Sequence, residues 1–84
     1  MRPQQLLKRI STSRKNVRFS DALMLARALG FQFDHTEGSP HILRHSGVPE
    51  FLNLQEVRGQ AKPYQLKQLL HLVERYNLTL GEHE

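Results

Sequence analysis

Cysteine is absent from the 84 residues, which excludes a disulfide framework, a thiolate nucleophile and a cysteine-type zinc site. Long apolar runs are also missing. The longest aliphatic stretch, Ala22 to Ala26, is far shorter than the roughly 20 residues of a membrane-spanning helix, and no apolar segment follows Arg2 as in a signal peptide. Neither a glycine-rich phosphate loop nor a His-Glu-x-x-His pattern is present, so nucleotide hydrolysis and zinc proteolysis have no positive signal. We therefore expect a cytoplasmic protein that does not enter a membrane.

The composition predicts one small α+β domain. Hydrophobic residues make up 38% of the chain and charged residues 24%, which suits a modest core better than a disordered or membrane-bound chain. We interpret residues 1–84 as a single domain, with a basic extension over residues 1–15 and a core over residues 16–80. Residues 81–84 are expected to form a frayed tail.

Positive charge is concentrated at the start of the chain. Six of the first eighteen residues are basic and none is acidic: Arg2, Lys8, Arg9, Arg14, Lys15 and Arg18. Clustered lysine and arginine create a local positive field, which attracts a polyanion such as RNA or an acidic partner protein. The alternative interpretation is a solvated, loosely ordered arm.

Apolar spacing predicts three helices. A short amphipathic helix is expected over residues 3–10, which is stable only when docked. A second helix is expected to begin at a Ser20 cap and to end before Gly30. Pro63 suits the first position of a final helix, whose apolar stripe consists of Leu66, Leu69, Leu70, Val73 and Tyr76.

Alternating polarity and turn residues predict three antiparallel strands, near residues 31–35, 41–45 and 51–57. The expected order is therefore short helix, helix, three strands, helix. Both main helices would then cover one face of the sheet and leave the other face open.

Histidine is the residue type with candidate chemistry, and His35, His41 and His45 lie around the first predicted hairpin. His41 and His45 would lie about 13 Å apart on one strand face, too far to share a zinc ion bound at about 2 Å, so we expect no metal site. A neutral imidazole can accept a proton from a ribose 2′-hydroxyl or donate one to a leaving oxygen. His41, beside a Gly-Ser turn, is therefore a candidate for RNA cleavage, whereas His71 lies outside the apolar stripe and is expected at the surface.

Basic side chains that could hold phosphate near His41 are Arg44, Arg58, Lys62 and Lys67. The alternative is that His41 is a half-exposed strand residue and that these charges only increase solubility.

Three segments closely resemble the HicA family of toxins. They are residues 37–45 (EGSPHILRH), 52–55 (LNLQ) and 59–66 (GQAKPYQL), and the resemblance extends from about Asn16 to Leu80. It implies a fold similar to the double-stranded RNA-binding domain, with helix, three strands and helix. It also implies a toxin of a type II toxin-antitoxin system, a ribonuclease that cuts messenger RNA without a bound metal or small-molecule cofactor and blocks translation. A HicB-type antitoxin would neutralise it by covering the RNA-binding surface.

The resemblance implies that a histidine near the Gly-Ser turn is catalytic, and His41 is the expected residue. Ser39, Arg44, Arg58, Lys62 and Lys67 are then expected to contact RNA. Many relatives carry two adjacent histidines after Gly-Ser, where this chain has Pro40 and His41. One alignment gives His41 the catalytic position, and the other gives that position to Pro40. Neighbouring strand residues face opposite ways, so His41 lies either on the RNA-binding face or beneath it. The second alignment would make the chain a weakened or inactive relative that still binds RNA or antitoxin.

Overall fold

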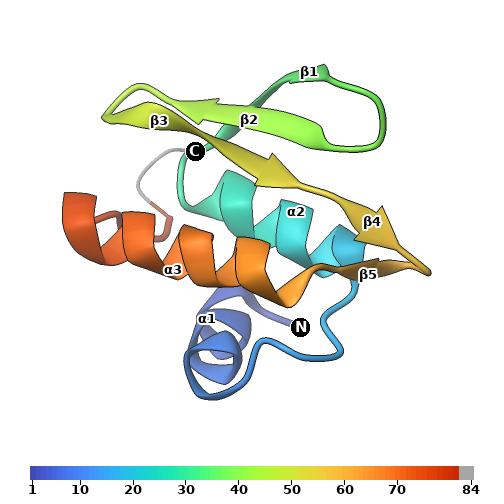
Figure 1. Ribbon diagram of the computed structural model, residues 1–84. Helices are drawn as coiled ribbons and strands as arrows, with labels where there is room; N and C mark the ends of the chain where they lie inside the picture. Colours follow the sequence, from blue (N-terminus) through green and yellow to red (C-terminus); the bar gives the residue numbers. More distant parts are fainter. Residues whose placement is uncertain (82–84) are drawn as a thin grey trace.

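The computed structural model describes residues 1–81 and has an α+β fold with three helices and a three-stranded antiparallel sheet (Figure 1). In chain order the elements are α1 (Pro3–Thr12), α2 (Phe19–Ala28), β1 (Gln32–Thr36), β2 (His41–His45), β3 (Val48–Leu54), β4 (Glu56–Val57), β5 (Gln60–Ala61) and α3 (Pro63–Tyr76). The predicted order of helices and strands is thus confirmed, with an additional short hairpin formed by β4 and β5. Most of the predicted C-terminal tail, residues 82–84, lies outside the described residues.

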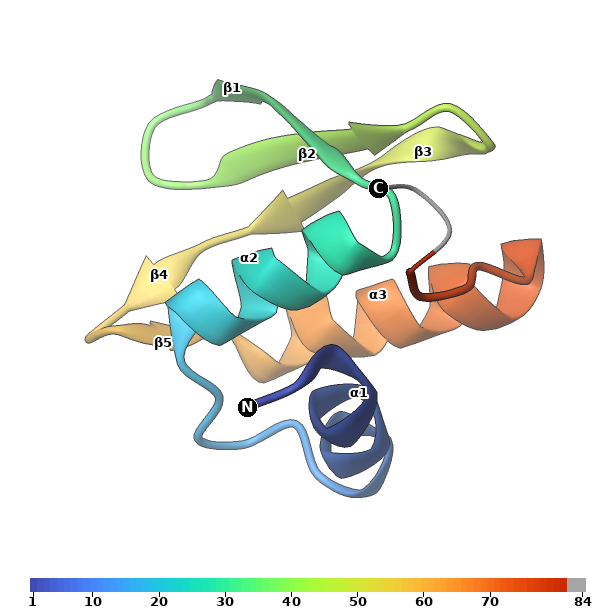
Figure 2. The ribbon, with the colours of Figure 1, turned by 180° about the vertical axis from the view of Figure 1, so that it is seen from behind.

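Three layers build the molecule. The sheet β1-β2-β3 lies over α2 and α3, and α1 packs against the other side of these helices (Figures 1 and 2). Leu25 of α2, Leu52 of β3 and Leu66 of α3 are fully buried between the layers. Leu6 and Ile10 of α1 are also fully buried and belong to the same core cluster, so α1 is a structural part of the domain.

The final helix follows the prediction at both ends. Pro63 is its first residue, and Asn77 ends it in the left-handed conformation, with φ of 53°. Leu66 and Leu69 of the predicted stripe are fully buried, while its other members are partly buried against the core. Leu72, which the stripe omitted, is also buried.

The start of α2 differs from the prediction. The helix begins at Phe19 with Arg18 at the N-cap position, and no side chain caps it. The Phe19 N–H instead donates to the Gly59 carbonyl oxygen over 2.9 Å. A backbone partner from the β4–β5 hairpin therefore replaces the expected Ser20 cap.

The third predicted strand also differs, because it is divided. β3 ends at Leu54, and the next N–H, that of Gln55, donates to the side-chain oxygen of Gln65 over 2.7 Å. Gln65 is the buried polar residue of α3, with 4% of its surface exposed. This bond draws the chain away from the sheet and toward α3, where β4 and β5 form their own hairpin.

Candidate nucleic-acid interface

The β4–β5 hairpin joins the N-termini of α2 and α3 at one end of the molecule (Figure 1). Arg18 pairs with Gln60 as an isolated β-bridge, and the Ala61 N–H donates to the Val17 carbonyl oxygen over 2.8 Å. α3 begins directly after β5, at Pro63. We call this region, formed by residues 18–21 and 56–67, the hairpin end.

The hairpin end carries an excess of positive charge. Its basic residues are Arg18, Arg58, Lys62 and Lys67, and its acidic residues are Asp21 and Glu56. No ion pair involves any of these six side chains within residues 1–81. The N-termini of α2 and α3 add partial positive charge, because helix dipoles point their positive ends this way. The combined field favours an anionic ligand.

An open pocket of about 440 Å³ lies at this end, lined by Val57, Arg58, Gln60, Ala61, Lys62 and Pro63. Its volume falls within the range of about 300–1,000 Å³ that is usual for ligand sites. Tyr64 follows the last lining residue and is 64% exposed. Lys62 is one of the lining residues, and its ammonium lies 5.9 Å from the centroid of the Tyr64 ring.

His41 is the first residue of β2 and is half-buried on the helix side of the sheet. Its ring makes edge contacts with Phe19 of α2 at 4.9 Å and with Phe33 of β1 at 5.8 Å between centroids. Its Nδ1 atom is buried and has no hydrogen-bond partner among the described residues. Phe19 connects His41 to the hairpin end, because the same residue is bonded through its N–H to Gly59.

The turn before His41 holds Ser39 at the surface. The Glu37 N–H donates to the Pro40 carbonyl oxygen over 3.1 Å, which closes the loop formed by Gly38 and Ser39. Gly38 has φ of 67°, a left-handed conformation that glycine adopts without steric cost. Pro40 is half-buried at the end of this loop, so the structure places Ser39 and His41 on either side of it.

Arg44 is separated from the other predicted phosphate ligands. It is exposed on the open face of the sheet, and its Nε lies 3.0 Å from the Asp34 carboxylate. His41 and Arg44 are three residues apart on β2 and therefore face opposite sides of the sheet. Arg58 and Lys62 thus line one pocket at the hairpin end, Lys67 follows on α3, and Arg44 lies on the open face of the sheet.

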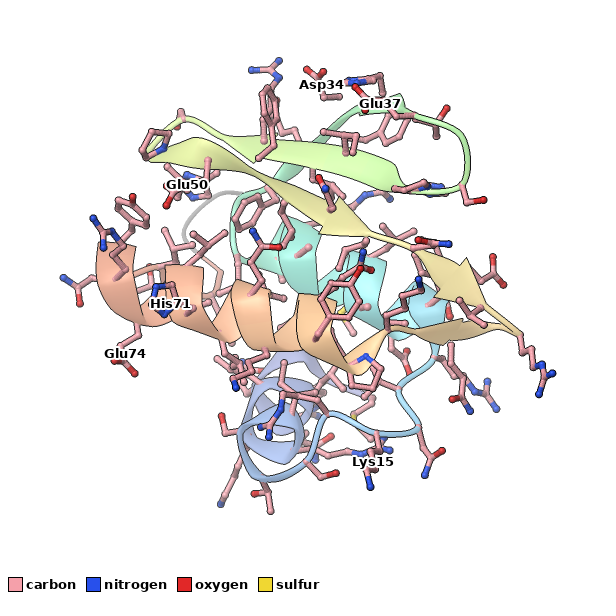
Figure 3. All side chains as sticks on the ribbon, viewed as in Figure 1. Lys15, Asp34, Glu37, Glu50, His71 and Glu74 are labelled. Carbon is pink, nitrogen blue, oxygen red and sulfur yellow. The ribbon has the colours of Figure 1, made fainter. Side chains whose placement is uncertain are left out.

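A charged cluster surrounds Arg44 on that open face. His35 Nδ1 lies 2.6 Å from Asp34, and His35 Nε2 lies 3.1 Å from Glu37. Figure 3 shows Asp34 and Glu37 on the side of the sheet that faces away from α3. Hydrogen bonds to Glu37 and then to Asp34 raise the pKa of His35 above its ordinary value, because both carboxylates stabilise the imidazolium.

The remaining predicted histidines have separate positions. His45 Nδ1 accepts the Gly47 N–H over 2.8 Å, and its ring contacts Phe31 at 5.2 Å, so it supports the β2–β3 turn. His71 is exposed on α3 (Figure 3). Within residues 1–81, no three histidine, aspartate or glutamate side chains form a group that could hold a metal ion.

Part of the N-terminal charge has a structural role. Arg14 Nη1 donates to the Ile10 carbonyl oxygen over 3.0 Å and so satisfies an acceptor near the C-terminus of α1. Arg9 Nη2 donates to the Asn16 carbonyl oxygen over 2.9 Å and fixes the segment before α2. Lys8 and Lys15 are exposed and form no ion pair in the part of the chain that the structure describes.

Sequence reasoning did not identify Tyr64 or Phe33 as site residues. Tyr64 could have been found from its position off the apolar stripe of α3, because that position predicts an exposed aromatic ring two residues after Lys62. Phe33 had no such signal, because its proximity to His41 depends on the pairing of β1 with β2.

Comparison with protein-family models, with curated proteins and with solved structures gave no match. In the described part of the chain, none of the helices has the length and apolar character needed to cross a bilayer.

Proposed function

We propose that this protein is a toxin of the HicA type, a ribonuclease that binds messenger RNA through the hairpin end and acts through His41. The observation that carries this proposal is a group of basic residues around the N-termini of α2 and α3. Within residues 1–81 these side chains form no ion pair, and the group adjoins Phe19, which contacts His41. RNA is a polyanion, and a positive surface without competing carboxylate partners suits it. The resemblance described above supplies the reaction class, and the order α2, three strands, α3 agrees with a fold like the double-stranded RNA-binding domain.

In the proposed reaction, the ribose 2′-oxygen attacks the adjacent phosphorus and the bond to the 5′-oxygen breaks. His41 serves as the base that takes the 2′-hydroxyl proton or as the acid that protonates the 5′-oxygen. Cations at the hairpin end stabilise the charge on the phosphate. The products are a 2′,3′-cyclic phosphate and a 5′-hydroxyl end, and products carrying only 5′-phosphate would contradict this route.

A non-catalytic RNA-binding or antitoxin-binding module is the second candidate function. One observation favours it: Nδ1 of His41 is buried beside aromatic rings, and no group within residues 1–81 bonds to it and orients the imidazole. Histidines that transfer protons usually have such a partner on the second ring nitrogen. Pro40 stands at the other possible catalytic position and has no titratable group.

The two functions differ in the effect of His41→Ala. We expect purified protein to cleave a long unstructured messenger RNA in excess EDTA, and His41→Ala to abolish cleavage while RNA binding persists. His71→Ala is the matched control, because it removes an exposed histidine from the middle of α3 and should cleave like wild type. Binding without cleavage by the wild type would instead support the second function.

A HicB-type antitoxin is the partner that this proposal implies. An antitoxin that covers the hairpin end would compete with RNA for the same cations. A toxin that acts on messenger RNA would do so in the cytoplasm, which is the location that this proposal implies.

A further inference from the structure

We infer that Tyr64 and the adjoining pocket bind an unpaired nucleotide, so that the hairpin end selects single-stranded RNA. This inference rests on the proposed RNA-binding function and specifies its substrate. The double-stranded RNA-binding fold implied by the resemblance to HicA toxins would instead read a duplex through its shape and its phosphates.

The first argument is the exposure of Tyr64. This ring lies on the first turn of α3, off its buried stripe, and is 64% exposed. Its hydroxyl forms no hydrogen bond within residues 1–81, and its only ring partner there is the Lys62 ammonium. A large aromatic side chain in this position contributes nothing to the core. It offers a flat surface on which a base can stack once that base is free of a duplex.

The second argument is the pairing of aromatic and cationic groups. A nucleotide presents a flat base and a phosphate a few ångströms apart. Lys62 lies beside the Tyr64 ring and also lines the pocket, so it can meet the phosphate of a nucleotide whose base stacks on Tyr64. Val57, which is 44% exposed, adds an apolar wall to the same pocket.

The third argument is the backbone of Arg58. Three non-glycine residues among the described ones have positive φ: Asn16, Arg58 and Asn77. Asparagine tolerates the left-handed conformation, whereas arginine does so at a cost. Strain that is retained beside a pocket points to a functional use of the side chain. Arg58 also lines the pocket, where its guanidinium can contact a second phosphate.

The experiment compares three fluorescein-labelled probes by anisotropy: a single-stranded 12-mer RNA, the same RNA annealed to its complement, and an abasic 12-mer. Tyr64→Ala should weaken binding of the single strand by about 5- to 150-fold, the range known for the loss of one stacked base. Binding of the duplex and of the abasic strand should not change. Tyr64→Phe, which keeps the ring, should bind like wild type.

Tyr76→Phe provides a second control, because it changes the other tyrosine, whose hydroxyl donates to Glu50 over 2.6 Å near the far end of α3. It should bind the single strand like wild type. Equal affinity of wild type and Tyr64→Ala for the single strand would overturn the stacking inference and leave RNA binding intact. Equal losses on all three probes would also overturn it, because the effect would not depend on a base. No binding of any RNA by the wild type would overturn the proposed function as well.

Discussion

Replacement of Arg58 by Asn separates the folding role of the β4–β5 turn from its proposed role in RNA binding. Arg58 and Gly59 connect the two strands, with φ of 54° and 79°. A two-residue turn with positive φ at both positions favours Asn-Gly, because the left-handed conformation costs an ordinary residue about 1–2 kcal/mol. Arg58→Asn should therefore raise the free energy of unfolding by about 1 kcal/mol, which corresponds to an increase in Tm of about 4–8 °C for a domain of this size.

The same substitution should weaken RNA binding, because it removes a cation from the pocket. If Arg58 contacts one phosphate, the slope of log affinity against log salt concentration should become shallower by about 0.7 for single-stranded RNA. The control is Arg27→Gln, which removes an exposed positive charge from the last turn of α2, at the other end of that helix. It should change neither RNA affinity nor the salt slope, and it should not raise Tm.

Circular dichroism melts measure the change in stability, and anisotropy titrations at about 50 and 200 mM salt measure the slope. A Tm of Arg58→Asn at or below that of wild type would refute the strain argument. An unchanged affinity and slope would refute the phosphate contact. The two results are independent, so each step of the reasoning can fail by itself.

Two further predictions concern the fold and its pH dependence. Gln65→Ala should lower the free energy of unfolding, measured in urea, by about 1–3 kcal/mol, because the Gln55 N–H loses its acceptor. The control Gln68→Ala, on the exposed side of α3, should lower it far less. Equal losses in the two variants would contradict the role of this bond. Glu37 and Asp34 raise the pKa of His35 above its ordinary value of 6.5. Protonated His35 therefore stabilises the folded protein fully below pH 6.5, and this stabilisation is lost as the pH rises through the higher pKa of His35 in the folded protein. Thermal melts between about pH 5.5 and 8.5, where carboxylates stay ionised, should show this loss of stability in wild type and not in His35→Gln. The same slope of Tm against pH in both proteins would disprove it.

The order of the main elements could be predicted because local signals mark them. Pro63 begins α3 and Asn77 ends it, and the apolar spacing between them is helical. The start of α2 could not be predicted in detail. Its first N–H bonds to Gly59, which is forty residues away in sequence, and no local pattern reports such a partner.

The β4–β5 hairpin was missed for a different reason. Each of its strands has two residues, too few for an alternating pattern, and its position depends on the bond between Gln55 and Gln65. The candidate site depends on this hairpin, because the hairpin brings Arg58 and Lys62 beside the N-terminus of α2. The sequence therefore identified these two cations as candidate phosphate ligands, but only the tertiary structure shows that they lie together.

The position of Arg44 could have been predicted from the sequence alone. A spacing of three residues on a strand without a bulge between them puts His41 and Arg44 on opposite faces. We expected His41 and Arg44 to act on the same phosphate because they are close in the chain. The same rule explains why Leu43, two residues from His41, is buried on the helix side with it.

The distribution of charge distinguishes between two surfaces that RNA could use. An approach to the open face of the sheet meets the carboxylates of Asp34 and Glu37, and Arg44 on that face is already paired. An approach to the hairpin end meets four basic and two acidic side chains, none of which forms an ion pair within residues 1–81, and two positive helix ends. The Phe19 N–H bonds to Gly59 at that end, and the Phe19 ring contacts the His41 ring at 4.9 Å between centroids. A position of His41 beneath the open face is therefore compatible with a role in RNA cleavage, provided that the RNA binds at the hairpin end and not across the sheet.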